Sequence, residues 1–99
     1  MDVRVNQHFV WDAVEGAVDY RVELSKLDGT VEAQPVVTET SILVGDLIAG
    51  VTGIALGDTR RVRVRARSLV GGTPVGGDYT DYLTFVLVGL SAPENLRVE

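Results

Sequence analysis

Arginine is concentrated in one short stretch of the chain, and its guanidinium group is suited to binding carboxylate or phosphate oxygens. Five of the nine lysine and arginine residues lie between positions 60 and 67. Side chains alternate between the two faces of a β-strand, so a strand here places four of these arginines on one face. The four are Arg61, Arg63, Arg65 and Arg67. This stripe predicts either a patch for an acidic partner, such as lipopolysaccharide phosphate, or a ladder of ion pairs across neighbouring strands.

The ion-pair ladder is the favoured interpretation. Asp19 and Glu23 lie on the neighbouring predicted strand and face the same way. Opposite charges on adjacent strands stabilise a sheet by about 0.2–1 kcal/mol per pair. A single glutamate within that strand cannot neutralise four arginines, so part of the stripe is expected to stay uncompensated.

A second candidate surface follows the glycine-rich residues 71–77. These residues lack the Lys-Ser/Thr of a phosphate-binding loop and do not open a helix, so they predict a flexible loop between two strands. Asp78, Tyr79 and Tyr82 stand beside this loop. Tyrosine offers a large contact area at low entropic cost, and these three residues are therefore candidate partner-binding residues together with the four arginines.

The sequence predicts no catalytic residue, no cofactor site and no metal site. His8 is the only histidine, and no Gly-x-Ser-x-Gly nucleophile motif accompanies it. Cysteine is absent, and no calcium-loop pattern occurs. Asp12, Glu15 and Asp19 lie around one predicted bend, where they are expected to be solvated turn acids, because glycoside chemistry needs two carboxylates across a cleft. We therefore expect a protein that is not an enzyme.

Length and composition narrow the class further. Ninety-nine residues, of which 45% are hydrophobic, suit one domain with one core. No apolar stretch approaches the roughly 18 residues that span a bilayer, which predicts no membrane insertion. The net charge of −5 argues against a nucleic-acid binder.

Hydrophobic residues recur with a period of two along most of the chain, which is typical of β-strands. Strands are predicted within residues 3–11, 20–25, 31–37, 41–47, 61–68 and 79–88. Asp28 and Gly29 predict a hairpin turn, and residues 48–58 predict a longer connection with room for one helical turn. The alternation assigns eight residues to the core: Phe9, Trp11, Tyr20, Val22, Leu24, Val62, Val64 and Ala66. This spacing predicts an all-β antiparallel sandwich of six to seven strands.

Three motifs resemble the fibronectin type III domain of bacterial and phage proteins. Residues 11–22 are similar to the pattern W-x-A-V-x-G-A-x-x-Y-x-V, and residues 54–66 to L-x-P-G-T-x-Y-x-V-x-V-x-A. Residues 92–98 resemble the first strand of such a domain. The resemblance implies an immunoglobulin-like sandwich over residues 1–88. One departure is Arg60, which stands where the family usually has the tyrosine of its tyrosine corner.

The second departure is the position of the first-strand motif after the last predicted strand. It implies that residues 89–99 are an inter-repeat linker and the opening strand of a next repeat, with a circular permutant as the alternative. Five linker residues reach about 17 Å, whereas a seven-residue strand is about 23 Å long. Residues 92–99 are therefore expected either to project disordered or to add to an open strand edge of another molecule.

The resemblance implies a non-catalytic structural spacer or binding and adhesion module of a larger multidomain protein. Residues 85–93 resemble junctions between repeats in host-specificity proteins of phage tail tips. The implied partners are neighbouring repeats, tail proteins, or a cell-surface protein or polysaccharide, on a virion tail or at the bacterial cell surface. The alternative is an accessory domain of a secreted bacterial enzyme or surface protein that binds polysaccharide.

Overall fold

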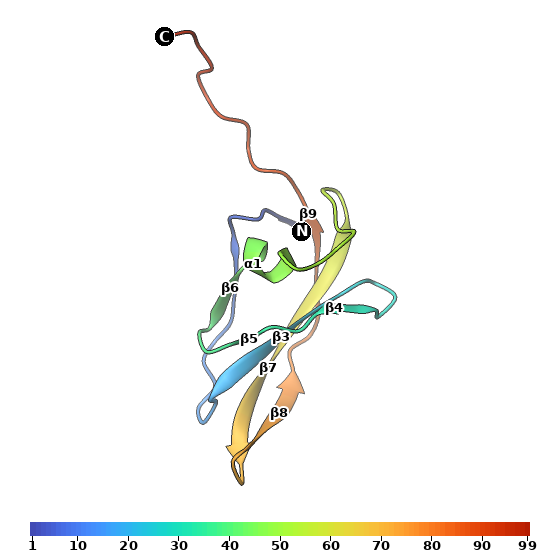
Figure 1. Cartoon of the computed structure of the whole chain (residues 1–99), viewed down its shortest axis with the longest axis vertical. Coiled ribbons are helices and arrows are strands. Elements are labelled where there is room, and N and C mark those ends of the chain that lie inside the picture. Colours follow the sequence, from blue (N-terminus) through green and yellow to red (C-terminus); the bar gives the residue numbers. More distant parts are fainter.

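The computed structural model describes residues 1–99, and the fold is all-β with one short helix (Figure 1). In chain order the elements are β1 (Asp2–Val3), β2 (His8–Val10), β3 (Asp19–Ser25), β4 (Val31–Ala33), β5 (Val36–Val37), β6 (Ser41–Leu43), α1 (Val44–Ile48), β7 (Thr59–Val70), β8 (Thr73–Tyr79) and β9 (Leu83–Leu87). No helix is long and apolar enough to cross a membrane.

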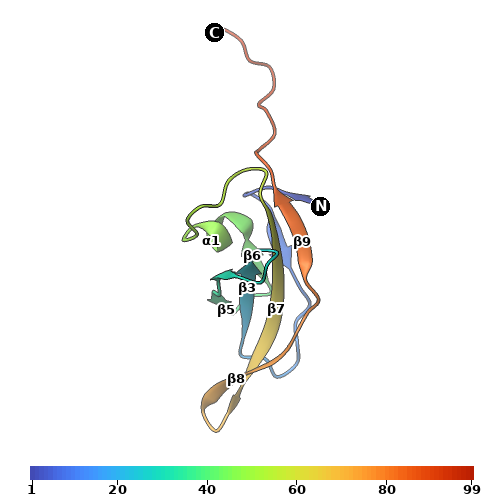
Figure 2. The same cartoon turned by 90° about the vertical axis from the view of Figure 1, so that its right-hand side faces the viewer.

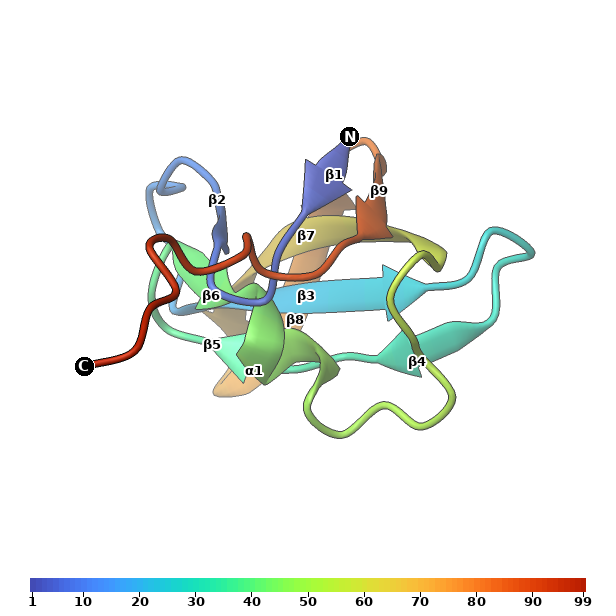
Figure 3. The same ribbon diagram turned by 90° about the horizontal axis from the view of Figure 1, so that it is seen from above.

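The strands form a seven-stranded sheet and a separate two-stranded ladder. The large sheet has the order β1-β9-β7-β3-β4, with β5 also paired to β3 and β8 also paired to β7. All of its pairs are antiparallel except β1 with β9, which run parallel, so the prediction of a wholly antiparallel sheet is wrong at this pair. The ladder joins β2 to β6, and it lies to one side of the main sheet (Figure 3).

The hydrophobic core lies between the sheet and the β2–β6 ladder. Phe9 of β2 packs on Phe85 of β9, with ring centroids 5.1 Å apart, and α1 adds Val44 and Leu47. Six of the eight predicted core residues are buried, whereas Trp11 and Ala66 are half-buried at its margin. The core residues outside the prediction are Val3, Ile42, Val44, Leu47, Phe85 and Leu87.

Two tight turns fix the hairpins. The predicted turn at Asp28 and Gly29 is confirmed: Gly29 has φ 93°, and the N–H of Lys26 donates to the carbonyl of Thr30 at 2.9 Å. At the second turn the prediction of a flexible loop over residues 71–77 is wrong. Gly71 and Gly72 have φ values of 59° and 81°, which lets the chain reverse within two residues, and β8 then pairs with β7.

The predicted strand over residues 41–47 is only partly correct. It ends at Leu43, and α1 begins at Val44. The N–H groups of Val44 and Gly45 donate to the carbonyls of Gln7 and Val5, so contacts made at the start of the helix are to the segment before β2. This tertiary contact overrides the local strand pattern.

Beyond β9 the chain forms no further strand or helix. Leu96 and Val98 are 98% and 99% exposed, and this C-terminal segment extends away from both the sheet and the ladder (Figure 2). Residues 92–99 therefore do not pack against β2 of their own molecule.

Arg60 is the one arginine of the 60–67 stretch on the core-facing side of β7. Its Nε donates to Glu32 Oε1 of β4 at 2.5 Å, and the two side chains are only 10% and 8% exposed. Its Nη1 donates to the carbonyl of Thr59 at 3.0 Å. A buried guanidinium without a carboxylate would be strongly destabilising, so Glu32 makes this arginine compatible with the core.

Removal of Glu32 alone should therefore destabilise the fold more than removal of the whole ion pair. Removing one partner of a buried ion pair costs about 3–5 kcal/mol. We expect Glu32→Leu to lower the free energy of unfolding by about 3 kcal/mol, because Asp58 stays 3.8 Å from Arg60 and partly replaces Glu32. The double variant Arg60→Met with Glu32→Leu should lose less. Urea denaturation measures both, with Glu15→Leu, an exposed turn position, as the control. A double variant less stable than Glu32→Leu would contradict the account.

Candidate functional site

The register between β3 and β7 places charged residues opposite one another on the outer face of the sheet. Asp19 lies opposite Arg67, Arg21 opposite Arg65, Glu23 opposite Arg63 and Ser25 opposite Arg61. Directly opposed residues share a face. Together with two tyrosines they form a surface named here the arginine–tyrosine face: Asp19, Arg21, Glu23, Ser25, Arg61, Arg63, Arg65, Arg67, Tyr79 and Tyr82.

Two of the four predicted arginines are neutralised by carboxylates of β3. Arg67 donates from Nε to Asp19 Oδ1 at 2.6 Å and from Nη2 to Asp19 Oδ2 at 2.8 Å. Arg63 binds Glu23 in the same two-pronged way, at 3.1 and 3.3 Å. The predicted cross-strand ladder is confirmed at these two pairs. Asp19 was expected to be a solvated turn acid, and that expectation is wrong because it lies within β3 opposite Arg67.

The two tyrosines stack on the arginines of β7. The guanidinium carbon of Arg61 lies 3.9 Å from the ring centroid of Tyr82, and that of Arg63 lies 3.9 Å from Tyr79 and 4.6 Å from Tyr82. Arg65 extends the series, 4.6 Å from Tyr79. Rings and cations therefore alternate along the strand, an arrangement that holds each guanidinium group by cation–π attraction.

Asp78 does not join this surface. It is exposed and precedes Tyr79 in β8, and Tyr79 pairs with Arg65. Alternation along the strand directs the Asp78 side chain to the opposite face. Of the seven predicted partner-binding residues, the fold thus brings six together.

Three of the five arginines on the face have no carboxylate partner: Arg61, whose Nε donates to Ser25 Oγ at 3.4 Å, and the pair Arg21 and Arg65. The least compensated of the three are Arg21 and Arg65. They lie directly opposite each other, and neither has a carboxylate within ion-pair distance. Arg65 makes no hydrogen bond, and Arg21 only a 3.5 Å contact with Gln34. The Nε atoms of both are buried without an acceptor. Sequence reasoning missed Arg21, although its position between Asp19 and Glu23 in the alternation would have identified it.

Gly76 leaves room for Arg65. Any side chain at position 76 would place its Cβ against the guanidinium group of Arg65, and Tyr79 covers another part of the same group. Arg65 is therefore held in a slot made by β8, which keeps its position fixed on the outer face.

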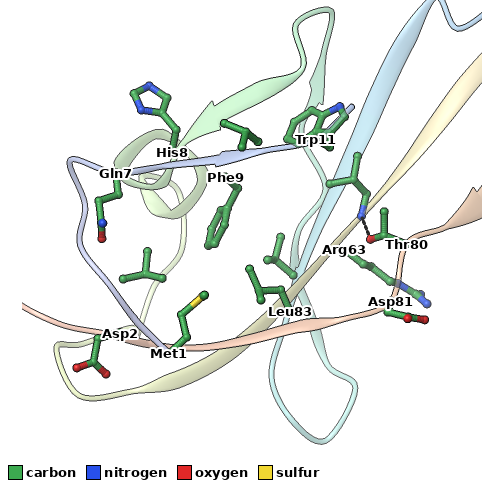
Figure 4. Close-up of a pocket in the computed structure, with 14 residues that line it drawn as sticks. Met1, Asp2, Gln7, His8, Phe9, Trp11, Arg63, Thr80, Asp81 and Leu83 are labelled. Carbon is green, nitrogen blue, oxygen red and sulfur yellow. Dashed lines mark hydrogen bonds between the residues drawn. The ribbon is translucent and has the colours of Figure 1, made fainter. Parts of the chain in front are cut away.

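A groove of about 460 Å³ adjoins the arginine–tyrosine face, because Arg63 is among its lining residues (Figure 4). Its lining comes from residues 1–3, 7–11, 62–64, 80–81 and 83. Phe9 and Met1 point into it, whereas His8 points away. The groove is mainly apolar, with Asp2 and Asp81 among its polar lining residues, and this chemistry suits a hydrophobic segment more than a charged ligand.

No group of three or more His, Cys, Asp or Glu side chains comes together as a metal site. His8 is exposed on β2, and Asp12 and Glu15 are exposed in the bend before β3.

Comparison with known proteins assigns the chain to no family. No protein-family model, curated protein or solved structure matches it. The three motifs that resemble fibronectin type III domains remain a prediction of family, and the all-β architecture is what the structure shows.

The Asp19–Arg67 pair predicts a loss of stability in acid. Hydrogen bonding to Arg67 lowers the pKa of Asp19. A carboxyl with a lowered pKa stabilises the fold above its unfolded pKa of about 3.9, and this contribution disappears as the pH falls through the lowered pKa. The stability difference between the wild type and Asp19→Asn should therefore be largest near neutral pH and shrink below about pH 4.

Urea denaturation from pH 7 downward measures this difference. Asp12→Asn, at an exposed position without an ion pair, is the control and should parallel the wild type. Asp28, whose pKa is also lowered by hydrogen bonds from Thr30, leaves a residual acid dependence in Asp19→Asn. A difference between the wild type and Asp19→Asn that stays constant with pH would contradict the assignment.

Proposed function

We propose that the chain is a non-catalytic spacer and binding module of a larger protein, with the fold of a fibronectin type III sandwich. Its arginine–tyrosine face binds phosphate groups of an acidic partner such as a cell-surface polysaccharide. The observation that carries the proposal is the opposed pair of Arg21 and Arg65, which no carboxylate of the chain neutralises.

The charge balance of the face supports an anionic partner. Five arginines share it with two carboxylates, and both carboxylates are engaged by Arg63 and Arg67. Like charges directly opposite each other on a sheet are destabilising. A phosphate bound at Arg21 and Arg65 would offset this repulsion and accept hydrogen bonds from the terminal nitrogens of the two guanidinium groups, and arginine recognises phosphate geometry well.

The sandwich is supported by the position of the core between the sheet and the β2–β6 ladder, together with the motifs at residues 11–22 and 54–66. In this fold Arg60 replaces a tyrosine and is paired with Glu32. The context that fits the resemblance is a repeat of a phage tail-tip protein, on the virion or at the bacterial surface.

An accessory module that grips polysaccharide by aromatic stacking is the second candidate. The tyrosines that would serve it already stack on guanidinium groups at 3.9 Å. This arrangement favours recognition of charge over stacking on sugar rings.

The proposal is tested by titrating isotope-labelled protein with inorganic phosphate and following the NMR signals of the backbone amides and the arginine Nε groups. We expect saturable shifts centred on Arg21, Arg65 and Gly76. Loss of one guanidinium group in Arg21→Gln or Arg65→Gln should weaken binding about tenfold, as expected for charge-assisted hydrogen bonds. Lys26→Gln, an exposed charge-matched control, should bind as the wild type does.

Chloride at matched ionic strength separates phosphate binding from general screening, and a phosphorylated oligosaccharide separates a polysaccharide-borne phosphate from the free ion. Equal, unsaturated shifts in phosphate and chloride, or unchanged binding in Arg65→Gln, would refute the proposal.

A further inference from the structure

The groove borders a strand edge that has no partner. β2 pairs only with β6, and the backbone N–H of Trp11 donates to the carbonyl of Thr40 at 3.0 Å. Phe9 stands two residues before Trp11 and opposite Ile42, so its N–H and C=O groups also point to β6. The alternation of an antiparallel ladder then directs the N–H and C=O groups of His8 and Val10 to the other edge, where an added strand can pair with them.

β1 defines the direction of such a strand. It runs parallel to β9, with Val3 opposite Leu87, and residues 4–7 turn the chain from β1 into β2, with Gln7 N–H donating to the carbonyl of Arg4 at 3.1 Å. Met1 lies in the groove. A strand that continued the line of β1 backwards from Met1 would run antiparallel to β2 along the open edge.

The C-terminal segment has the pattern that the groove requires. Leu96 and Val98 are 98% and 99% exposed and alternate with Arg97 and Glu99. In a strand, one face of this segment is therefore apolar and the other is charged. No helix or strand of the same molecule covers this apolar stripe, and an exposed apolar stripe is suited to an apolar partner.

The segment of the same molecule is badly placed to fill the groove. It leaves the end of β9 that carries Leu87, beside Val3, and extends away from the strands (Figure 1). Filling its own groove in the required direction would need a return along the whole strand. Residues 89–93 span about 17 Å when extended, whereas a seven-residue strand is about 23 Å long.

We propose that the groove of one molecule takes residues 92–99 of a second copy as an added strand. This strand runs antiparallel to β2, with its Glu99 beside Met1 of the molecule that receives it. Counting back from Val3 in steps of two through Met1 places Val98 and Leu96 on the same core-facing side. Their side chains then pack on Phe9, Val62 and Leu83, which line the groove.

This contact is head-to-tail, because the donated strand and the groove are different surfaces. Every molecule then carries one donor strand and one receiving groove, so association produces reciprocal dimers or rings where the geometry closes and open chains where it does not. The inference does not depend on phosphate binding at Arg21 and Arg65, neither of which lines the groove.

Sedimentation velocity over a range of concentrations tests the proposal with paired variants. Leu96→Asp with Val98→Asp removes the donor at positions that make no contact in the monomer. Val10→Pro removes a backbone N–H donor from the open edge of β2 in the receiving molecule, and proline is tolerated at an edge position. The wild type and the control Leu69→Asp, an apolar residue 56% exposed on the β7–β8 hairpin, should associate as concentration rises, and each disabled variant should stay monomeric.

The most decisive experiment mixes the variant Leu96→Asp with Val98→Asp and the variant Val10→Pro. One keeps an intact groove and the other an intact donor, so the mixture should form a one-to-one heterodimer that does not grow. Three results would overturn the proposal: a wild type that stays monomeric, association of the variant Leu96→Asp with Val98→Asp, or a mixture that forms no heterodimer.

A peptide of residues 92–99 keeps the test decisive even when Val10→Pro fails to fold. Titrated into the variant Leu96→Asp with Val98→Asp, which has lost its own donor strand, the peptide should shift the amide signals of His8 and Val10. The chain has no cysteine, so Glu99→Cys with Asp2→Cys reports the strand direction: a disulfide between copies supports the proposed direction. Peptide shifts elsewhere, or no disulfide in the associated state, would contradict it.

Discussion

The strict alternation of side chains along β7 is the constraint on which the rest of the structure depends. Val62 and Val64 face the core, and Arg61, Arg63 and Arg65, which alternate with them, face outward. A shift of one residue in register would bring several arginines into the core and expose the valines. Seven residues of β3 pair with β7, so the side chains of β3 are divided in the same way into core-facing and outward-facing ones. The core and the charged face are therefore determined together.

The outer face then follows from which residues oppose one another. Asp19 and Glu23 neutralise their partners, while Arg21 meets another arginine. β8 strengthens this arrangement because the Gly71–Gly72 turn folds it back onto β7, bringing Tyr79 and the slot at Gly76 against Arg65. Neither strand alone produces the surface. On the inner face the one arginine that enters, Arg60, requires Glu32 from β4.

Local pattern was sufficient to predict much of this arrangement from sequence. The alternation in residues 61–67 predicted both the buried valines and the outward arginines, and Asp28 with Gly29 predicted a turn because their backbone preferences are local. Features that depend on tertiary contact were missed. The helix α1 depends on hydrogen bonds to Val5 and Gln7, and β8 pairs through glycines that locally favour a loop. The opposition of Arg21 and Arg65 depends on a register that single strands do not reveal.

The central claim is that Arg21 and Arg65 repel each other within the folded chain and have no ion-pair partner in it. A double-mutant cycle with Arg21→Gln, Arg65→Gln and the double variant, measured by urea unfolding at low salt, tests it most directly. The account predicts an unfavourable coupling between the two arginines of about 0.2–1 kcal/mol, which shrinks as added salt screens the charges. A favourable coupling, or none at low salt, would contradict it.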